Sequence, residues 1–300
     1  MKNSSKLSLF VWLALSLGLA QAADVKRTED VVYGRKFGTA LTLDVFQPAK
    51  PNGYGVIFMV SGGFFSSHEA ISPRSYAPFL DRGYTVFAVV HGSQPRFIIS
   101  EIEQDIHRAV RFIRHNASTW GVSPDHLGIS GGSAGGHLSL TMGTQGKPGD
   151  PKAKDPIDRE SSAVQAVACF FPPTDFLNWG KDGEDGVGYG PTEKYAPAFG
   201  ARASTASGRQ ELGKEISPIN YVSSKMAPTL VIHGSADKQV PLYQAQIFEK
   251  RCKELNAPYK LIVREDKDHG WPGMEQDMKM FADWFDVHLR GAKAGQAAGS

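Results

Sequence analysis

The sequence predicts an α/β fold, with a mostly parallel central sheet and helices on both of its faces. Short apolar runs, each ending near Gly or Pro, alternate along the chain with longer amphipathic stretches. Strands buried on both faces of a parallel sheet have this composition, and their alternation with helices is typical of such a sheet. The 300 residues are 41% hydrophobic, enough to bury one large core, which favours a single domain over residues 23–290.

The expected strands follow a more polar N-terminal lead-in, and the first of them alternates in character like a half-exposed strand. The others are continuous apolar runs, most of them followed by Gly or Pro. The expected strands are 41–46, 56–60, 85–90, 126–130, 164–171, 229–232 and 259–264.

Helical periodicity lies between these strands. Apolar residues step by three or four positions over 102–113 and again over 278–289, so each set lines one face of a helix. Pro241 opens a third expected helix, which runs to about residue 255, at the position where a helix tolerates proline. Residues 137–142 can begin a further helix.

One long stretch, residues 174–217, does not fit this alternation. It is rich in Gly, charge and isolated aromatic residues, which include Trp179, Tyr189, Tyr195 and Phe199. A structureless loop of that length is unusual unless it is functional or disordered. The stretch is either a surface excursion or a small cap over the functional site. We favour the cap, with Trp179, Tyr189 and Tyr195 as substrate-binding aromatics, because it joins two strands whose ends should line the site.

A serine stands where a strand is expected to turn into a helix. Residues 131–135 read Gly-Gly-Ser-Ala-Gly and match the pattern G-x-S-x-G, directly after the strand 126–130. A sharp strand-to-helix turn pushes the central Ser133 clear of the backbone, and its flanking positions must be small because chain segments crowd there. The helix N-terminus also favours the negative charge that develops during nucleophilic attack. Ser133 is therefore the expected nucleophile.

A serine hydroxyl needs a base, and the base needs a carboxylate to orient it. His269 comes just after the last expected strand and Asp237 just after the preceding one, so both can reach Ser133 at the same sheet edge. Asp175, which follows an earlier strand, is a second candidate for the acid. Asp268 is disfavoured because a sequence neighbour of His269 would have to strain to reach its imidazole.

The oxyanion formed by attack needs N–H donors arranged in advance. One expected donor is the backbone of Ala134, the residue after the nucleophile. The others are expected in the loop 61–64, Ser-Gly-Gly-Phe, where glycines allow close approach to a substrate carbonyl.

Residues 129–137, Ile-Ser-Gly-Gly-Ser-Ala-Gly-Gly-His, and 233–241, His-Gly-Ser-Ala-Asp-Lys-Gln-Val-Pro, carry a family resemblance. The chain, from about residue 41 to 289, resembles the α/β-hydrolase esterase/lipase group that includes acetyl esterases and bifunctional acetyl-xylan and feruloyl esterases. The resemblance implies the order nucleophile Ser133, acid Asp237 and base His269. It also implies that Gly63, Phe64 and Ala134 donate to the oxyanion.

The chain departs from this family in the oxyanion loop. Ser61 stands where His-Gly-Gly is usual, and Phe64 stands where Gly is common. Since the donors are backbone groups, Phe64 can still serve.

The N-terminus reads as a secretory signal peptide over residues 1–22. Lys2 and Lys6 precede an apolar run, and Ala20-Gln21-Ala22 has the small-x-small form of a cleavage site. A membrane anchor is the alternative, but the run is shorter than the ~20 residues of a spanning helix. No Cys follows the run, which disfavours a lipoprotein anchor. We expect a secreted or periplasmic protein with no stable membrane anchor, and a disordered tail over 291–300.

Composition excludes several other classes of function. Lys plus Arg number 33 and Asp plus Glu 31, a net charge of +2, so no strong field favours nucleic acid as a partner. The two cysteines, Cys169 and Cys252, have no metal-ligand spacing, and we expect unpaired thiols, at least one of them buried. The nine histidines form no HExxH motif, so neither a metal nor another cofactor is expected.

The preferred function is an exported serine esterase that cleaves carboxylic esters of small acyl groups or polysaccharides through an acyl-enzyme. A prolyl-oligopeptidase-type peptidase shares the fold and triad order. Such peptidases usually carry an aromatic residue and a Tyr around the nucleophile, where this chain has Gly132 and Ala134, and we expect no N-terminal propeller of the kind typical of that class. A non-catalytic binding protein on the same scaffold usually lacks one member of the triad, and none is missing here. Acyl and alcohol specificity stay open, and the sequence carries no signal for oligomeric state.

Overall fold

The computed structural model describes residues 25–292. The expected signal peptide and the tail from residue 293 lie outside the described residues. Within them, no helix is long and apolar enough to cross a bilayer.

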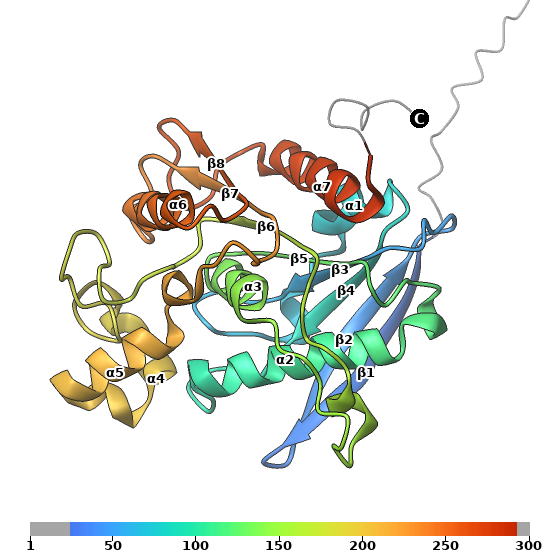
Figure 1. Cartoon of the computed structure of the whole chain (residues 1–300), viewed down its shortest axis with the longest axis horizontal. Helices are drawn as coiled ribbons and strands as arrows, with labels where there is room; N and C mark the ends of the chain where they lie inside the picture. The colour runs from blue at the N-terminus through green and yellow to red at the C-terminus, as the bar shows by residue number, and fades with distance from the viewer. Residues whose placement is uncertain (1–24, 293–300) are drawn as a thin grey trace, which may run out of the picture.

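Residues 25–292 form one eight-stranded sheet in the order β1-β2-β4-β3-β5-β6-β7-β8 (Figure 1). Strands β4, β3, β5, β6, β7 and β8 run parallel to one another, whereas β2 pairs antiparallel with both β1 and β4. The strands are β1 (Lys26–Lys36), β2 (Thr39–Gln47), β3 (Gly55–Met59), β4 (Thr85–Val90), β5 (Leu127–Gly132), β6 (Ala166–Phe170), β7 (Thr229–Gly234) and β8 (Tyr259–Arg264). The predicted mostly parallel sheet is confirmed.

The observed strands match the apolar runs closely, with one exception. Strand β1 falls in the polar lead-in, for which no strand is expected. It is an edge strand with many exposed residues, so it carries little of the apolar signal that identifies a buried strand.

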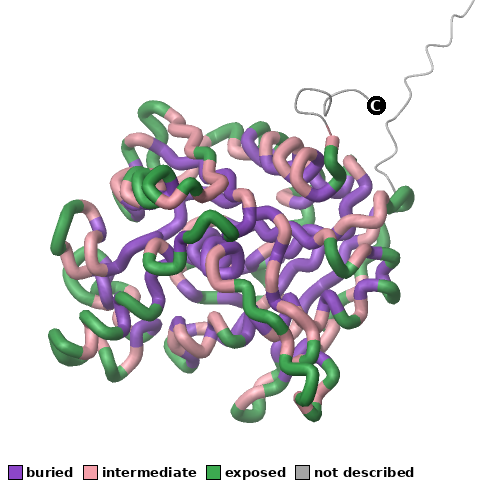
Figure 2. Tube along the Cα trace, viewed as in Figure 1, coloured by how far each residue is buried: buried purple, intermediate pink, exposed green. Residues whose placement is uncertain are grey.

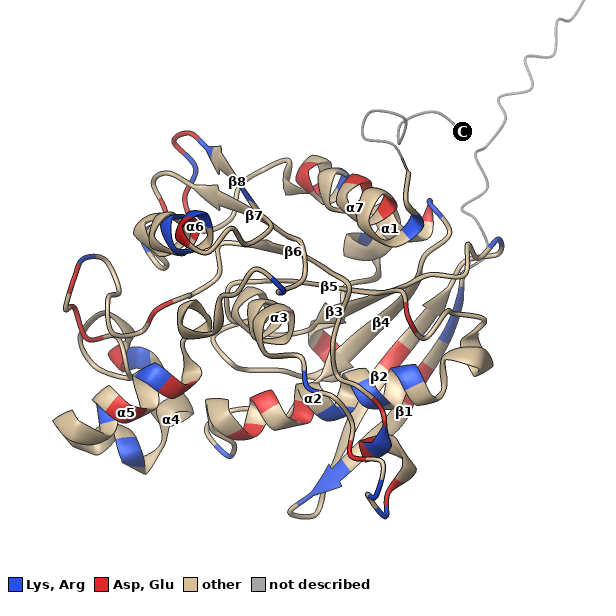
Figure 3. Ribbon diagram, in the orientation of Figure 1, with Lys and Arg blue, Asp and Glu red and all other residues tan. Residues whose placement is uncertain are grey.

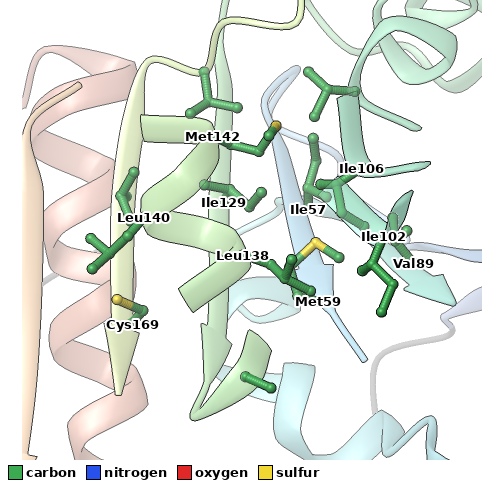
Figure 4. Close-up of a cluster of buried hydrophobic side chains, with 14 of the residues drawn as sticks. Ile57, Met59, Val89, Ile102, Ile106, Ile129, Leu138, Leu140, Met142 and Cys169 are labelled. Atoms are coloured by element: carbon green, nitrogen blue, oxygen red, sulfur yellow. The ribbon is translucent and has the colours of Figure 1, made fainter. Parts of the chain in front are cut away.

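Helices cover both faces of the sheet. Buried residues of α2, α3 and α6 share one hydrophobic cluster, and those of α1 and α7 share another on the opposite face. The first cluster is seen where α2 and α3 meet β3 and β5 (Figure 4). These helices are α1 (Ala77–Leu80), α2 (Ile99–His115), α3 (Ala134–Gln145), α6 (Tyr243–Glu254) and α7 (Met274–Arg290).

Helix α3 lies in the middle of the molecule. Its residues 134–143 are all buried, and Figure 2 shows it as the purple centre of the trace. It bears no Lys, Arg, Asp or Glu, whereas both signs of charge are interspersed on α2, α5 (Ala206–Ile216) and α6 (Figure 3). Helix α3 is therefore packed on every side, which fixes the end of the turn that leads into it.

The stretch 174–217 has structure of its own. It contains the short helices η5 (Gly190–Tyr195), α4 (Ala196–Phe199) and η6 (Ala201–Ser204), and then α5. Phe176, Trp179 and Phe199 are buried in the same cluster as α2 and α3. The irregular spacing of these aromatics therefore does not keep them out of the core, because short 3₁₀ and loop segments bring them together.

Both cysteines are buried and unpaired within the described part of the chain, Cys169 on β6 and Cys252 on α6. This confirms the expectation of two free thiols. Burial raises the pKa of the Cys169 thiol well above its ordinary value, so this sulfur stays protonated and packs as an apolar group.

Candidate active site

Ser133 occupies a sharp turn between β5 and α3. Its φ of +55° lies in a region that L-residues rarely adopt. A Cβ added at Gly131 would lie 2.6 Å from the carbonyl oxygen of Gly135, and one at Gly136 would lie 2.7 Å from that of Phe170. Only glycine fits at such approaches, so the small residues around Ser133 are what allow the turn to form.

The structure brings Ser133, His269 and Asp237 together. The Nε2 atom of His269 lies 2.9 Å from the Ser133 Oγ, and its Nδ1 lies 2.8 Å from an oxygen of Asp237. A carboxylate only accepts hydrogen bonds, so Nδ1 carries the proton and Nε2 presents its lone pair to the serine hydroxyl. The three side chains come from the carboxyl ends of β5, β8 and β7, as the sequence predicts.

Asp237 is held from four directions. One carboxylate oxygen accepts the backbone N–H groups of Gln239 and Val240, both at 2.9 Å. The other faces His269 and, at 3.5 Å, the Nε2 of buried His233, which also donates to the Val240 carbonyl. Burial raises the pKa of this carboxyl, but the hydrogen bonds from His233, His269 and Val240 outweigh burial and hold it well below its usual range.

The other candidate carboxylates have different partners. Asp175 accepts from the backbone of Leu177 and the side chain of Asn178, which makes it a local turn-forming residue. Asp268 accepts from the backbone N–H of Lys238 and of His269 itself, so it supports the loop and does not face the imidazole.

The loop after β3 forms a tight turn. Gly62 and Phe65 exchange two backbone hydrogen bonds, and the two residues between them, Gly63 and Phe64, have φ of +56° and +64°. Consecutive positive φ angles are typical of a type I′ turn. Among the described residues, the backbone N–H groups of Gly63 and Phe64 have no hydrogen-bond acceptor.

A small cavity lies beside Ser133. The residues that form its wall include all three expected oxyanion donors, and the full set is Gly63, Phe64, Ser133, Ala134, Pro173, Phe176, Trp179, Thr192, Tyr195, Phe199, Gln239 and Val240. Its volume is about 20 Å³. A cavity of about 470 Å³ between β1 and α2 shares none of these residues, so size alone does not locate the site.

The three aromatics expected to bind substrate differ in position. Trp179 and Tyr195 line the cavity, and the Tyr195 ring lies so close to Gly63 that a Cβ there would come within 2.6 Å of it. Tyr189 is 57% exposed, stacks on the Arg209 guanidinium and is not part of the cavity wall. Phe176, Thr192 and Val240 also line the cavity, and nothing in the local sequence pattern shows that they converge there.

A possible metal-binding cluster lies elsewhere, among the residues that the structure describes. Glu29, Asp44 and His68 bring three potential ligand atoms within 4.8 Å of one another. The Arg27 guanidinium already pairs with both carboxylates, at 2.8 Å from Asp44 and 3.0 Å from Glu29. A cation bound there would have to displace it, so this cluster is an ion-pair network.

The sheet order, the strand-to-helix turn and the convergence of three strand ends define the α/β-hydrolase class. Residues 43–252, well over half of the chain, match the BD-FAE family profile. The chain belongs to the BD-FAE family of esterase domains.

Individual relatives agree with this family. The chain is 27% identical over 238 residues to Esterase LipQ of Mycobacterium tuberculosis, covering 77% of this chain and 54% of LipQ. It spans about half the length of the curated relatives it matches. A truncated carbohydrate esterase from gut microbiota superposes with a TM-score of 0.75 at 25% identity, covering 88% of this chain and 96% of that one.

An acetyl ester-xyloside bifunctional hydrolase from Caldicellulosiruptor lactoaceticus has a TM-score of 0.68 at 21% identity, covering 91% of this chain and 97% of that structure. At this identity the likeness concerns the fold.

Proposed function

We propose that this protein is an exported serine esterase that hydrolyses esters of small acyl groups, acetyl above all, through an acyl-enzyme on Ser133. The observation that carries the proposal is the continuous hydrogen-bond chain from Ser133 through His269 to Asp237, with contacts of 2.9 and 2.8 Å. Proton transfer over such contacts is what makes a serine hydroxyl nucleophilic.

The reaction follows from this geometry. The Ser133 Oγ attacks the ester carbonyl carbon while His269 Nε2 takes the hydroxyl proton, and Asp237 stabilises the imidazolium. The negative charge moves to the carbonyl oxygen, where the N–H groups of Gly63, Phe64 and Ala134 can receive it. Collapse expels the alcohol, which takes the proton from His269. Water then attacks the acyl-enzyme by the same steps, releasing the carboxylic acid and restoring Ser133.

The size of the cavity supports a preference for small acyl groups. About 20 Å³ beside Ser133 is little more than the 10–15 Å³ that one water molecule needs. An acetyl methyl group fits such a space, whereas a butyryl chain or a feruloyl ring requires Trp179 or Tyr195 to move.

The proposed identity of the alcohol group is supported by similar proteins. The fold neighbours include a carbohydrate esterase and an acetyl ester-xyloside hydrolase. Together with the expected signal peptide, they support an acetylated polysaccharide outside the cytoplasm as the substrate, and a secreted or periplasmic location. Trp179 and Tyr195 would then act as the substrate-binding aromatics.

The test is a hydrolysis panel with the purified protein. The substrates are 4-nitrophenyl acetate, butyrate and octanoate, methyl ferulate, acetylated xylan and a proline-containing peptide amide. We expect kcat/KM to fall steeply beyond acetate and to vanish for the amide. Ser133→Ala is the matched blank for each substrate. Equal kcat/KM for acetate and octanoate would contradict the small-acyl assignment, and turnover of the amide above that of acetate would favour a peptidase.

A further inference from the structure

Gln94 lies in the loop between β4 and α2, next to the turn 62–65. It is only 4% exposed. Its side-chain Nε2 donates to the Gly63 carbonyl at 2.6 Å, and its backbone N–H donates to the Phe64 carbonyl at 3.1 Å. One residue from a different loop therefore binds the carbonyl groups on both sides of Phe64.

The turn that Gln94 binds contains a strained backbone position. A non-glycine residue at positive φ, as at Phe64, is strained because its Cβ crowds the backbone. The Phe64 side chain is buried and packs edge-on against His137 at 5.6 Å between ring centres. Packing fixes the side chain, but the orientation of the peptide planes depends on their hydrogen bonds.

The contact with Gly63 has a direct consequence for the neighbouring N–H. The carbonyl of Gly63 and the N–H of Phe64 belong to one planar trans peptide unit and point in opposite directions. Fixing the carbonyl toward Gln94 therefore fixes the N–H on the opposite side, and Phe64 lies in the wall of the cavity beside Ser133 whereas Gln94 does not. A hydrogen bond accepted by the carbonyl also polarises the unit and strengthens its N–H as a donor.

We propose that Gln94 is a positioning residue for the oxyanion site, acting through the Gly63–Phe64 peptide unit. The inference rests on the proposed function, in which the Phe64 N–H receives the developing negative charge. Gln94 touches no reacting atom; it sets the direction and donor strength of a group that does.

The same loop holds the turn at a second point. His91 is buried, and its Nε2 lies 2.8 Å from the Ser61 hydroxyl while its Nδ1 lies 2.8 Å from the Gly92 carbonyl. Burial lowers the pKa of His91 to about 4, so the ring is neutral at pH 7. Nδ1 then donates to Gly92 and Nε2 accepts from Ser61, which ties the start of the turn to the loop after β4.

The test uses Gln94→Met, which keeps the volume and removes the donor. The matched control is Gln145→Met, at a half-buried glutamine at the far end of α3 whose amide nitrogen has no partner among the described residues. We expect Gln94→Met to lower kcat for acetate by about 10- to 100-fold, because misdirecting an oxyanion donor costs less than deleting one. KM should change by less than about twofold, since the contact matters in the transition state.

A second readout separates positioning from loss of folding. The inhibition constant of a trifluoromethyl ketone, which adds to serine as a tetrahedral oxyanion, should rise by the same factor as kcat falls. Gln94→Leu should behave like Gln94→Met. The melting temperatures of both should differ from wild type by no more than that of Gln145→Met does.

Unchanged kcat in Gln94→Met, or a loss confined to KM, would overturn the inference while leaving the serine mechanism intact. If the Ser133→Ala enzyme stayed active, the proposed function itself would fail.

Discussion

Asp237→Asn is a sensitive test of the site, because the structure specifies what each atom of the new amide would face. One carboxylate oxygen accepts two backbone N–H groups, so the amide oxygen must occupy that place. The NH₂ group then faces His269 Nδ1, where the oxygen stood at 2.8 Å. Two donors cannot pair, and the imidazole must move its proton to Nε2.

That change of tautomer places an N–H opposite the Ser133 hydroxyl, 2.9 Å away, and leaves no lone pair to take its proton. Loss of the correct tautomer costs roughly 10⁴-fold in kcat, or about 5 kcal/mol of transition-state stabilisation. KM should change little, since the substrate does not contact Asp237.

The assay is steady-state hydrolysis of 4-nitrophenyl acetate at pH 8, with Asp175→Asn as the matched control. The control replaces a buried aspartate whose oxygens serve Leu177 and Asn178, so it should keep most of its activity. An Asp237→Asn enzyme that retains more than about a tenth of wild-type kcat would refute the reasoning. So would an Asp175→Asn enzyme that is the more damaged of the two.

Three further predictions concern the cavity, acid stability and the turn. Tyr195→Ala should raise the butyrate-to-acetate ratio of kcat/KM, whereas Tyr189→Ala, outside the cavity wall, should leave it unchanged. Burial lowers the pKa of His107 from its ordinary value of about 6.5 to about 3, so the folded state loses stability as the pH falls below about 6.5. The urea midpoint should therefore fall between pH 7 and pH 5, and it should fall less in His107→Asn than in the wild-type protein. Gly131→Ala should lower the melting temperature, because the new Cβ would lie 2.6 Å from the backbone oxygen of Gly135. Gly132→Ala should leave the melting temperature unchanged, because the nearest atom to its new Cβ is 3.4 Å away.

The strands of the sheet centre were predictable because burial on both faces leaves an uninterrupted apolar run. Residues 85–90 coincide with β4, which is buried over almost its whole length. Strand β1 was not predicted, because an edge strand with exposed side chains has neither an apolar run nor a clean alternation of apolar and polar residues. The aromatic part of the core in 174–217 was not predicted for a different reason. Its short helices have too few turns to show a helical period of apolar residues.

The polar residues of the site were predictable from topology, and its walls were not. The carboxyl ends of neighbouring parallel strands meet at one edge, which is why Ser133, Asp237 and His269 could be brought together from sequence order alone. Tyr189 and Tyr195 look alike in sequence, and only the path of η5 separates the exposed ring from the one against Gly63. Gln94 has no motif, because its partners are backbone carbonyls of another loop.

The central claim is that Ser133 is the nucleophile, and covalent labelling tests it most directly. The wild-type protein should react with a fluorophosphonate to give one adduct, which peptide mass spectrometry locates on Ser133, with parallel loss of esterase activity. Ser133→Ala should neither label nor turn over 4-nitrophenyl acetate, while unfolding at the wild-type temperature. Labelling of the Ser133→Ala protein at the wild-type rate, or an adduct on another residue, would contradict the account.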